Sequence, residues 1–294
     1  MTNRKPIHLT VTILFIALFA TAIVAGCTSP TPNTTPTATS TATSTATQTS
    51  TPAAKTDLTV FAAASLADGA FNDTKAKFEL QHPEANVIFD FDGSQQLRTQ
   101  IEQGAYTDVF VSASTSHMNA LKNESYMNNS TISNFAKNKL AIAVPKSNPA
   151  NISSLTDLAN PGVKLVVCDK SVPCGNYTVQ MVDALANNSS YGPDYRTKFN
   201  ANEVSKETNV NFAISKVALG EADAAIVYVS DVPADMKDKV TIITIPDGLN
   251  VVATYPIGVT AQSKNQELAK AFEDYVESPD GQAILKQYGF ITTA

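Results

Sequence analysis

Short apolar runs alternate with amphipathic segments along most of the chain. The runs are rich in Val, Ile, Phe and Ala, which is typical of strands, whereas the amphipathic segments are typical of helices. We expect strands at 58–63, 86–91, 108–112, 139–144, 164–168, 224–229, 240–245 and 252–260, and helices at 66–80, 94–103, 118–122, 154–159, 176–186, 209–219, 265–277 and 279–288. This alternation predicts an α/β fold, in which helices cover both faces of parallel sheets.

The N-terminal segment does not follow this pattern. Arg4 and Lys5 precede an apolar stretch, and small residues lead up to Cys27. This arrangement predicts a signal peptide over 1–26, with Cys27 as a lipid attachment site. A retained membrane anchor is the alternative, because the apolar stretch is only slightly shorter than a membrane span. Residues 27–56 are mostly Thr, Ser, Pro and Ala, which predicts a disordered linker to a folded part that begins near residue 57.

The charge balance excludes one large class of partner. The chain has 21 basic and 27 acidic residues; without Arg4 and Lys5, 19 basic residues remain and the net charge is −8. A nucleic-acid-binding protein needs a basic surface to neutralise phosphates. We therefore expect no nucleic acid as a partner.

Two serines stand where predicted strands give way to helices. Ser65 follows three alanines, and Ser94 follows a strand that ends at Asp92-Gly93. In open α/β sheets, ligands bind beyond the carboxyl ends of the strands. Helix capping is the alternative explanation for both serines, and Ser65 with Asp68 fits a capping box. Capping does not explain the alanines, which leave room for something small.

A third junction lies at residues 167–178, VCDKSVPCGNYT. Pro173, Cys174 and Gly175 predict a tight turn with exposed main-chain N–H groups, and Gly175 lets a ligand approach closely. Because the chain is exported, we expect a disulfide between Cys168 and Cys174. Two cysteines without a nearby histidine do not make a metal site.

A fourth helix start and a further strand end complete the set of junctions. Thr208 or Asn209 is expected to cap the helix that has Val210 in its first turn. Tyr228 lies near the carboxyl end of the strand at 224–229. A tyrosine at such a position is either a core residue or a hydroxyl donor to a ligand.

Catalysis by Ser65 lacks a base. The three histidines are His8 in the signal, and His82 and His117 at helix ends away from the junctions. No G-x-S-x-G motif surrounds Ser65. Converging helix N-termini and hydroxyls instead favour an anion, held by neutral dipoles. With Asp92 as the sole nearby acceptor, such a pocket prefers a fully ionised oxyanion.

The motifs TVFAAASL, GSQQLRTQIEQGAYTDVFVSA, VPCGNYT, ALGEADAAIVYVSD, YPIGV and SPDGQAILKQYGF occur in this order along the folded chain. In order and spacing they are similar to those of the periplasmic molybdate-binding proteins of ABC transporters, the ModA family. The resemblance implies a two-lobed, hinged periplasmic-binding-protein fold of type II, with a mostly parallel mixed sheet in each lobe. It places lobe I at 57–141 and 254–294, and lobe II at 142–253.

The resemblance also implies a ligand and a set of contacts. Molybdate, and tungstate with it, would be held by the hydroxyls or amides of Ser65 and Ser94, the amides of Cys174 and Val210, and the hydroxyl of Tyr228. The metal would be present only within the oxyanion, with no cofactor and no enzyme activity. The protein would be a monomer, anchored outside the membrane through lipidated Cys27, and would deliver the anion to an ABC permease and its ATPase. A sulfate or phosphate receptor, or a cell-surface interaction module, are the alternatives.

Overall fold

A computed structural model describes residues 54–67, 69–232 and 236–293. The predicted signal peptide, the lipid attachment site at Cys27 and nearly all of the predicted linker lie outside these residues. Within them, no helix combines the length and the apolar character that crossing a membrane requires.

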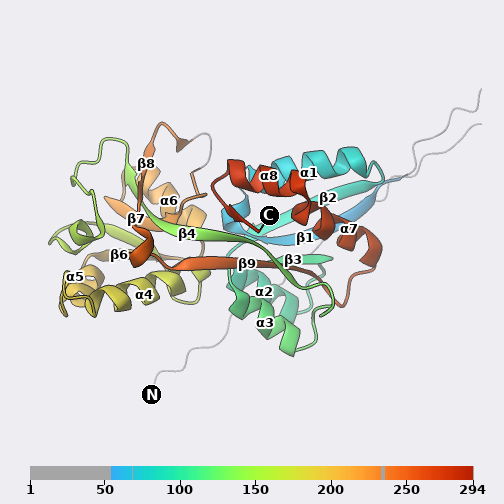
Figure 1. Cartoon of the computed structure of the whole chain (residues 1–294), viewed down its shortest axis with the longest axis horizontal. Coiled ribbons are helices and arrows are strands. Elements are labelled where there is room, and N and C mark those ends of the chain that lie inside the picture. The colour runs from blue at the N-terminus through green and yellow to red at the C-terminus, as the bar shows by residue number, and fades with distance from the viewer. Residues whose placement is uncertain (1–53, 68, 233–235, 294) are drawn as a thin grey trace, which may run out of the picture. The chain divides into compact units, whose positions relative to one another are not determined.

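The described residues form one ten-stranded sheet, in the order β2-β1-β3-β9-β4-β7-β5-β6, with β8 and β10 paired to β4. Its strands are β1 (Thr56–Ala63), β2 (Ala85–Asp92), β3 (Val109–Val111), β4 (Ser133–Pro145), β5 (Leu165–Cys168), β6 (Glu203–Glu207), β7 (Ala224–Tyr228), β8 (Val240–Thr244), β9 (Val252–Val259) and β10 (Ile291–Thr292). At one end β1 pairs in parallel with β2 and β3, and at the other end β5 pairs in parallel with β6 and β7. The long antiparallel strands β4 and β9 connect the two ends (Figure 1).

The first half of the sheet, β1 to β3, has helices on both faces. They are α1 (Ala70–Gln81), α2 (Ser94–Glu102), α3 (Thr115–Asn123), α7 (Gln266–Glu277) and α8 (Pro279–Gln287). Figure 1 shows α1, α7 and α8 on one face and α2 and α3 on the other. Phe71 and Phe78 are two helical turns apart on α1, so both pack against Phe272 of α7, with ring centroids 6.0 and 5.3 Å from it. Each buried phenylalanine stabilises this layer by roughly 1.5–3 kcal/mol.

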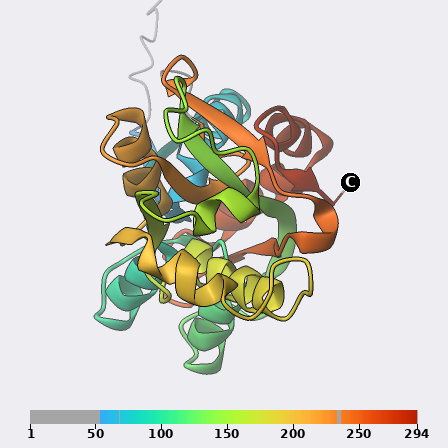
Figure 2. The ribbon, with the colours of Figure 1, turned by 90° about the vertical axis from the view of Figure 1, so that its left-hand side faces the viewer.

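The second half, β5 to β8, is built in the same way. Its helices are α4 (Pro173–Ala186), α5 (Tyr195–Ala201) and α6 (Val210–Ala218). Figure 2 turns this half toward the viewer, with the yellow helices α4 and α5 on one side of the strands. Strand β4 belongs to both halves, because it pairs with β9 up to Lys139 and with β7 from Leu140 onward.

The predicted α/β fold with helices on both faces is confirmed, and several elements differ from the predictions. The sequence analysis missed α5, β6 and the two-residue strand β10, and it predicted only the second part of β4. The helix expected at 66–80 begins only at Ala70, because a short 3-10 turn, η1 (Ala64–Leu66), comes between β1 and α1. The predicted lobe boundaries remain a prediction.

Candidate functional site

The five residues predicted to bind an anion line one cavity between the two halves. The cavity has a volume of about 20 Å³, just above the ~10–15 Å³ that a single water needs. Its lining consists of Ala63, Ala64, Ser65, Gly93, Ser94, Ala113, Val172, Pro173, Cys174, Asn209, Val210 and Tyr228. No side chain in this lining carries a formal charge. The cavity therefore suits one small solute, surrounded by neutral groups.

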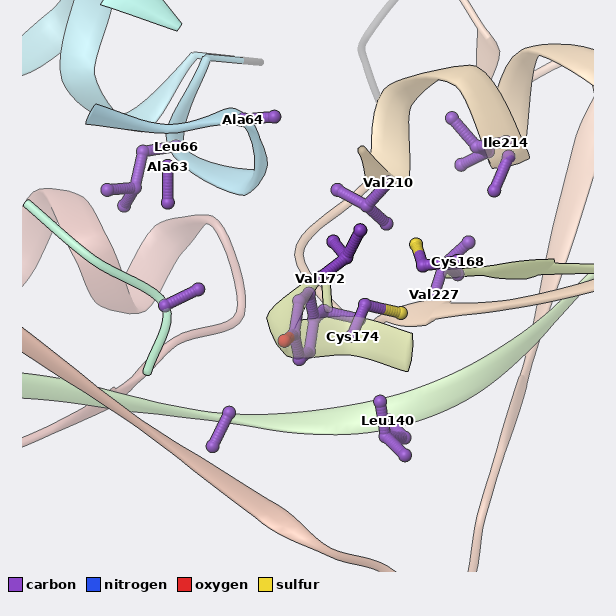
Figure 3. Close-up of a cluster of buried hydrophobic side chains, with 14 of the residues drawn as sticks. Ala63, Ala64, Leu66, Leu140, Cys168, Val172, Cys174, Val210, Ile214 and Val227 are labelled. Atoms are coloured by element: carbon purple, nitrogen blue, oxygen red, sulfur yellow. The ribbon is translucent and has the colours of Figure 1, made fainter. Parts of the chain in front are cut away.

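The parallel strands explain why these residues meet. Ala63 at the end of β1 lies beside Asp92 at the end of β2, so Ser65 and Ser94 follow neighbouring carboxyl ends. In the second half, Cys168 at the end of β5 pairs with Glu207 at the end of β6. The helices α4 and α6 begin just after these two strands. Figure 3 shows the resulting arrangement, with Ala63 and Ala64 on one side and Val172, Cys174 and Val210 on the other.

The first half contributes serine hydroxyls that already have protein partners. Ser65 is 4 % exposed, and its Oγ lies 2.8 Å from the hydroxyl of Tyr255. Ser94 is 1 % exposed and accepts a hydrogen bond from the Ala113 N–H at 3.0 Å. Both oxygens are held in place at the edge of the cavity.

Neither serine acts as the helix cap that was considered as the alternative. The N-cap of α1 is Gly69, with no side-chain capping bond, since Ser65 belongs to the preceding 3-10 turn. Asp68, its expected capping partner, lies outside the described residues. Ser94 is the first residue of α2, after the N-cap Gly93.

The second half contributes main-chain N–H groups from the first turns of two helices. Pro173 begins α4, so that Cys174 is its second residue. Val210 begins α6, and the Asn209 side chain caps this helix by accepting from the Phe212 N–H at 3.2 Å, as predicted. First-turn N–H groups have no acceptor within their own helix, and the helix dipole favours negative charge there.

Tyr228 is the last residue of β7, as predicted, and its side chain is 1 % exposed. Its hydroxyl is buried and has no hydrogen-bond partner among the described residues. Burial, with Tyr255 nearby, raises the pKa of Tyr228 well above its usual value, so the hydroxyl keeps its proton. A buried donor without an acceptor is costly, so this hydroxyl is a candidate donor to a ligand in the cavity.

Hydrogen bonds join the two halves around the cavity. Gln95 Nε2 donates to the Thr208 carbonyl at 2.8 Å, and Asn209 Nδ2 donates to Asp92 Oδ1 at 2.9 Å. Asp92 Oδ1 also accepts from the Gly93 N–H at 2.7 Å, so this oxygen is engaged away from the cavity. A Cβ on Gly93 would lie 2.5 Å from the Thr208 carbonyl oxygen. Glycine is thus required where the two halves come closest.

The predicted disulfide is not formed, because Cys168 and Cys174 are both free, buried thiols. The Cys174 thiol instead donates to the Ile226 carbonyl at 3.3 Å, and its hydrogen bond with Cys168, together with burial, raises its pKa well above the usual value. The turn before α4 is held by Asp169, whose carbonyl accepts from the Val172 N–H at 2.9 Å.

The reason for Gly175 also differs from the predicted one. A Cβ at this position would lie 2.0 Å from the Asp169 carbonyl oxygen. Glycine therefore lets the first turn of α4 pack against the preceding loop, rather than admitting a ligand.

The cavity contains no catalytic or metal-binding constellation among the described residues. His82 caps the end of α1 beside Glu84, and His117 lies in α3, so neither lines the cavity. No cluster of three His, Cys, Asp or Glu side chains suited to a metal ion occurs in residues 54–67, 69–232 and 236–293.

The sequence analysis missed the groups that support the cavity from behind. Tyr255 of β9 and Asn138 of β4 are both fully buried and contact each other, with Asn138 Nδ2 3.5 Å from the Tyr255 hydroxyl. Asn138 lies between Lys137 and Lys139, so nothing in the local sequence marks it as a buried residue.

The continuous sheet with a cavity between its halves defines a two-lobed solute-binding protein of the periplasmic type. Residues 58–291 match the family model described as bacterial extracellular solute-binding protein, and the chain belongs to this family. Its homologues are solute-binding transport proteins and not enzymes, as predicted.

Individual relatives agree with this assignment. The chain is 39 % identical over 233 residues to the molybdate-binding protein ModA of Mycobacterium tuberculosis, an alignment that covers 79 % of this chain and 84 % of the relative. It shares its fold with the periplasmic molybdate-binding protein of Azotobacter vinelandii, with a TM-score of 0.69, 20 % identity and coverage of 81 % and 100 %. The sulfate-binding protein SubI of Mycobacterium tuberculosis has a TM-score of 0.72, 18 % identity and coverage of 81 % and 87 %.

Proposed function

We propose that this protein captures molybdate, and tungstate with it, outside the cell membrane and delivers it to an ABC importer. The observation that carries the proposal is the Tyr228 hydroxyl, which has no partner among the described residues and lies in a small cavity with the first turns of α4 and α6. The 39 % identity to a mycobacterial molybdate-binding protein supports molybdate as the anion.

The proposed binding mode uses neutral donors from both halves. The hydroxyls or amides of Ser65 and Ser94 donate from the first half, and the amides of Cys174 and Val210 and the hydroxyl of Tyr228 donate from the second. Hydrogen bonds to an ionised acceptor are about twice as strong as those between neutral groups. Because donors come from both halves, the anion stabilises the closed arrangement.

The donor-rich lining favours anions that carry no proton. Hydrogen phosphate needs an acceptor for its proton, and no carboxylate lines the cavity. Asp92 Oδ1, the nearest candidate, already accepts from Gly93 and Asn209. Sulfate is the stronger competitor, since it is also a tetrahedral dianion and since a sulfate-binding protein shares the fold. A smaller anion reaches fewer donors at once, which favours molybdate.

Titration calorimetry with molybdate, tungstate, sulfate and phosphate tests the proposal. We expect tight binding of molybdate and tungstate and weak binding of the other two. Tight binding of sulfate with none of molybdate would contradict the proposal in favour of a sulfate receptor. Thermal unfolding with each anion is a second test, because a ligand at one hundred times its dissociation constant adds about 2.7 kcal/mol of stability. A cell-surface interaction module would show no shift with any oxyanion.

The route of the anion to the cell is part of the same proposal. Lipid attachment at Cys27 would hold the protein at the outer face of the membrane, with residues 28–56 as a flexible tether. The closed, loaded monomer would dock on the permease, whose ATPase drives uptake. Labelling with a radioactive fatty acid tests the anchor, and Cys27→Ala should abolish the label.

A further inference from the structure

We infer that Tyr255 is a positioning residue, which fixes the direction of the Ser65 hydroxyl so that Ser65 donates its proton into the cavity. This inference rests on the proposed function and deepens it. Tyr255 lies in β9, is fully buried and does not line the cavity itself. Its hydroxyl lies 2.8 Å from Ser65 Oγ, and the distance alone allows either atom to be the donor.

The orientation of Asn138 decides between the two directions. Its Oδ1 accepts a hydrogen bond from the Lys139 N–H at 2.9 Å. A main-chain N–H only donates, so this atom is the carbonyl oxygen and the other is the amide nitrogen. The nitrogen donates to Ser230 Oγ at 2.8 Å and lies 3.5 Å from the Tyr255 hydroxyl. An amide nitrogen does not accept, so the Tyr255 oxygen is the acceptor in this contact.

The proton of Tyr255 then goes to Ser65. Within the described chain, the Tyr255 hydroxyl contacts Asn138 and Ser65, and only Ser65 is able to accept. Burial raises the pKa of Tyr255 well above its usual value, so the proton stays on the phenol. Tyr255 therefore donates to Ser65 Oγ.

This direction leaves the proton of Ser65 free for a ligand. A serine hydroxyl has one proton, and with its oxygen accepting from Tyr255, that proton points away from the network. Since Ser65 lines the cavity, the proton is available to an oxyanion there. In the reverse direction, the lone pairs of Ser65 would face the anion and repel it.

The same network extends to the facing half. Ser230 Oγ, which accepts from Asn138, donates to Asp231 Oδ1 at 3.2 Å. Asp231 Oδ2 accepts from the Tyr228 N–H at 2.6 Å. One buried set of hydrogen bonds thus supports Ser65 on one side of the cavity and the strand end that carries Tyr228 on the other.

Tyr255→Phe removes the hydroxyl and keeps the aromatic ring, so it tests the role of the hydroxyl alone. The ring packs edge-on against Tyr228 and Phe290, with centroids 6.0 and 5.4 Å apart, and phenylalanine preserves this packing. Calorimetry with molybdate should compare the native chain, Tyr255→Phe, Ser65→Ala and the double variant. We expect Tyr255→Phe to weaken binding about three- to tenfold in the native background, the value of one hydrogen bond.

The decisive readout is the coupling between the two positions. If Tyr255 acts through Ser65, Tyr255→Phe causes no further loss in the Ser65→Ala background. An equal loss of molybdate affinity in both backgrounds, or no loss in the native background, would overturn the inference. The proposed function would still stand in that case, because the native chain would bind molybdate. If the native chain binds neither molybdate nor tungstate, the proposed function fails and the inference fails with it.

Tyr195→Phe is the matched control. Tyr195 is 2 % exposed, and its hydroxyl donates to the Leu155 carbonyl at 2.6 Å, with no part in the cavity lining. This variant also loses one buried hydroxyl, so its stability should fall while its molybdate affinity stays unchanged. A fall in affinity equal to that of Tyr255→Phe would overturn the inference, because the effect would then follow from lost stability.

Neutron diffraction from deuterated native crystals gives a test that needs no variant. We expect the deuteron of Tyr255 to point at Ser65 Oγ. A deuteron on Ser65 that points at the Tyr255 oxygen would overturn the inference even if the Tyr255→Phe chain failed to fold.

Discussion

The two sides of the cavity obtain their donors in different ways. On the first side, the hydroxyls of Ser65 and Ser94 are held by hydrogen bonds to Tyr255 and to the Ala113 N–H. On the second side, helix starts present main-chain N–H groups, and the Tyr228 hydroxyl has no partner in the described chain.

This difference between the two sides indicates at which positions a change of side chain should affect ligand binding. On the first side the serine hydroxyls are candidate donors, so their replacement should remove a hydrogen bond. At Cys174 and Val210 the proposed donor is the backbone, so the side chain matters little. The four substitutions below test this contrast, in order of decreasing effect on molybdate binding.

Val210→Pro should have the largest effect, because it removes a main-chain donor and places a ring beside the cavity. Val210 is the first residue of α6, where proline is tolerated, and Asn209 before it is extended, with φ −153° and ψ 168°. We expect a loss of about 3 kcal/mol in molybdate binding, the upper value for a hydrogen bond to a charged group. Val210→Ala keeps the N–H and should bind within ~0.5 kcal/mol of the native chain. If calorimetry gives Val210→Pro the same molybdate affinity as the native chain, the Val210 amide is not a donor.

Tyr228→Phe should weaken molybdate binding without lowering the stability of the free chain. The hydroxyl is buried and has no partner within the part of the chain that the structure describes, so its removal should weaken molybdate binding by about 2 kcal/mol. In the absence of anion the variant should be at least as stable as the native chain, since a costly buried donor is gone. Calorimetry and urea unfolding measure the two quantities. Reduced stability with unchanged affinity would assign Tyr228 to the core alone.

Ser65→Ala should weaken molybdate binding by at least ~1.5 kcal/mol, the lower value for a hydrogen bond to a charged group. The loss should be smaller than for Tyr228→Phe, because a water in place of the small hydroxyl partly replaces the donor. Calorimetry measures it, and affinity equal to that of the native chain would remove Ser65 from the proposed site.

Glu273→Gln tests whether a buried group without a partner matters only when it faces the cavity. Glu273 of α7 is 1 % exposed, one of its oxygens has no partner among the described atoms, and burial raises its pKa to about 8. A raised pKa stabilises the fold below the unfolded-state value of 4.5, and that stability is lost as the pH rises toward 8.

Glutamine cannot ionise, so Glu273→Gln should stabilise the chain above pH 8 by several kcal/mol, since each unit by which the pKa is raised corresponds to about 1.4 kcal/mol. The gain should vanish near pH 4, and molybdate affinity should not change. Thermal unfolding across this pH range measures the effect. A gain that is independent of pH would contradict the raised pKa.

The sequence predicted the strands with continuous apolar patterns, and it missed elements whose stability comes from their neighbours. The run at β1 is buried nearly throughout, whereas β6 reads EVSKE and is an edge strand that pairs only with β5. The sequence pattern of β6 alone does not favour a strand. This segment is a strand because it forms hydrogen bonds with β5. The helix α5 has seven residues, of which Tyr195 and Phe199 are buried, and is too short to show a clear helical period.

The predicted site residues line one cavity, whereas the buried residues behind them, Tyr255 and Asn138, were not predicted. Helix starts and strand ends are visible in sequence, so Ser65, Ser94 and Tyr228 were found from residue type and position. For Cys174 and Val210 the resemblance to a family was needed, since the proposed donor is the backbone. Tyr255 and Asn138 lie on strands that a local pattern cannot place beside Ser65, because 190 residues separate Ser65 from Tyr255.

The two strands that cross between the halves limit how the protein can move. Ser133–Lys139 of β4 pairs with Val252–Ile257 of β9, with one irregularity in the register between Asn134 and Ala136. A two-stranded ribbon bends and twists without breaking its ladder, whereas sliding one strand past the other would rupture it. We therefore expect the two halves to separate by bending of this ribbon, with the strand pairing kept, so that closing would return the same groups to the same positions.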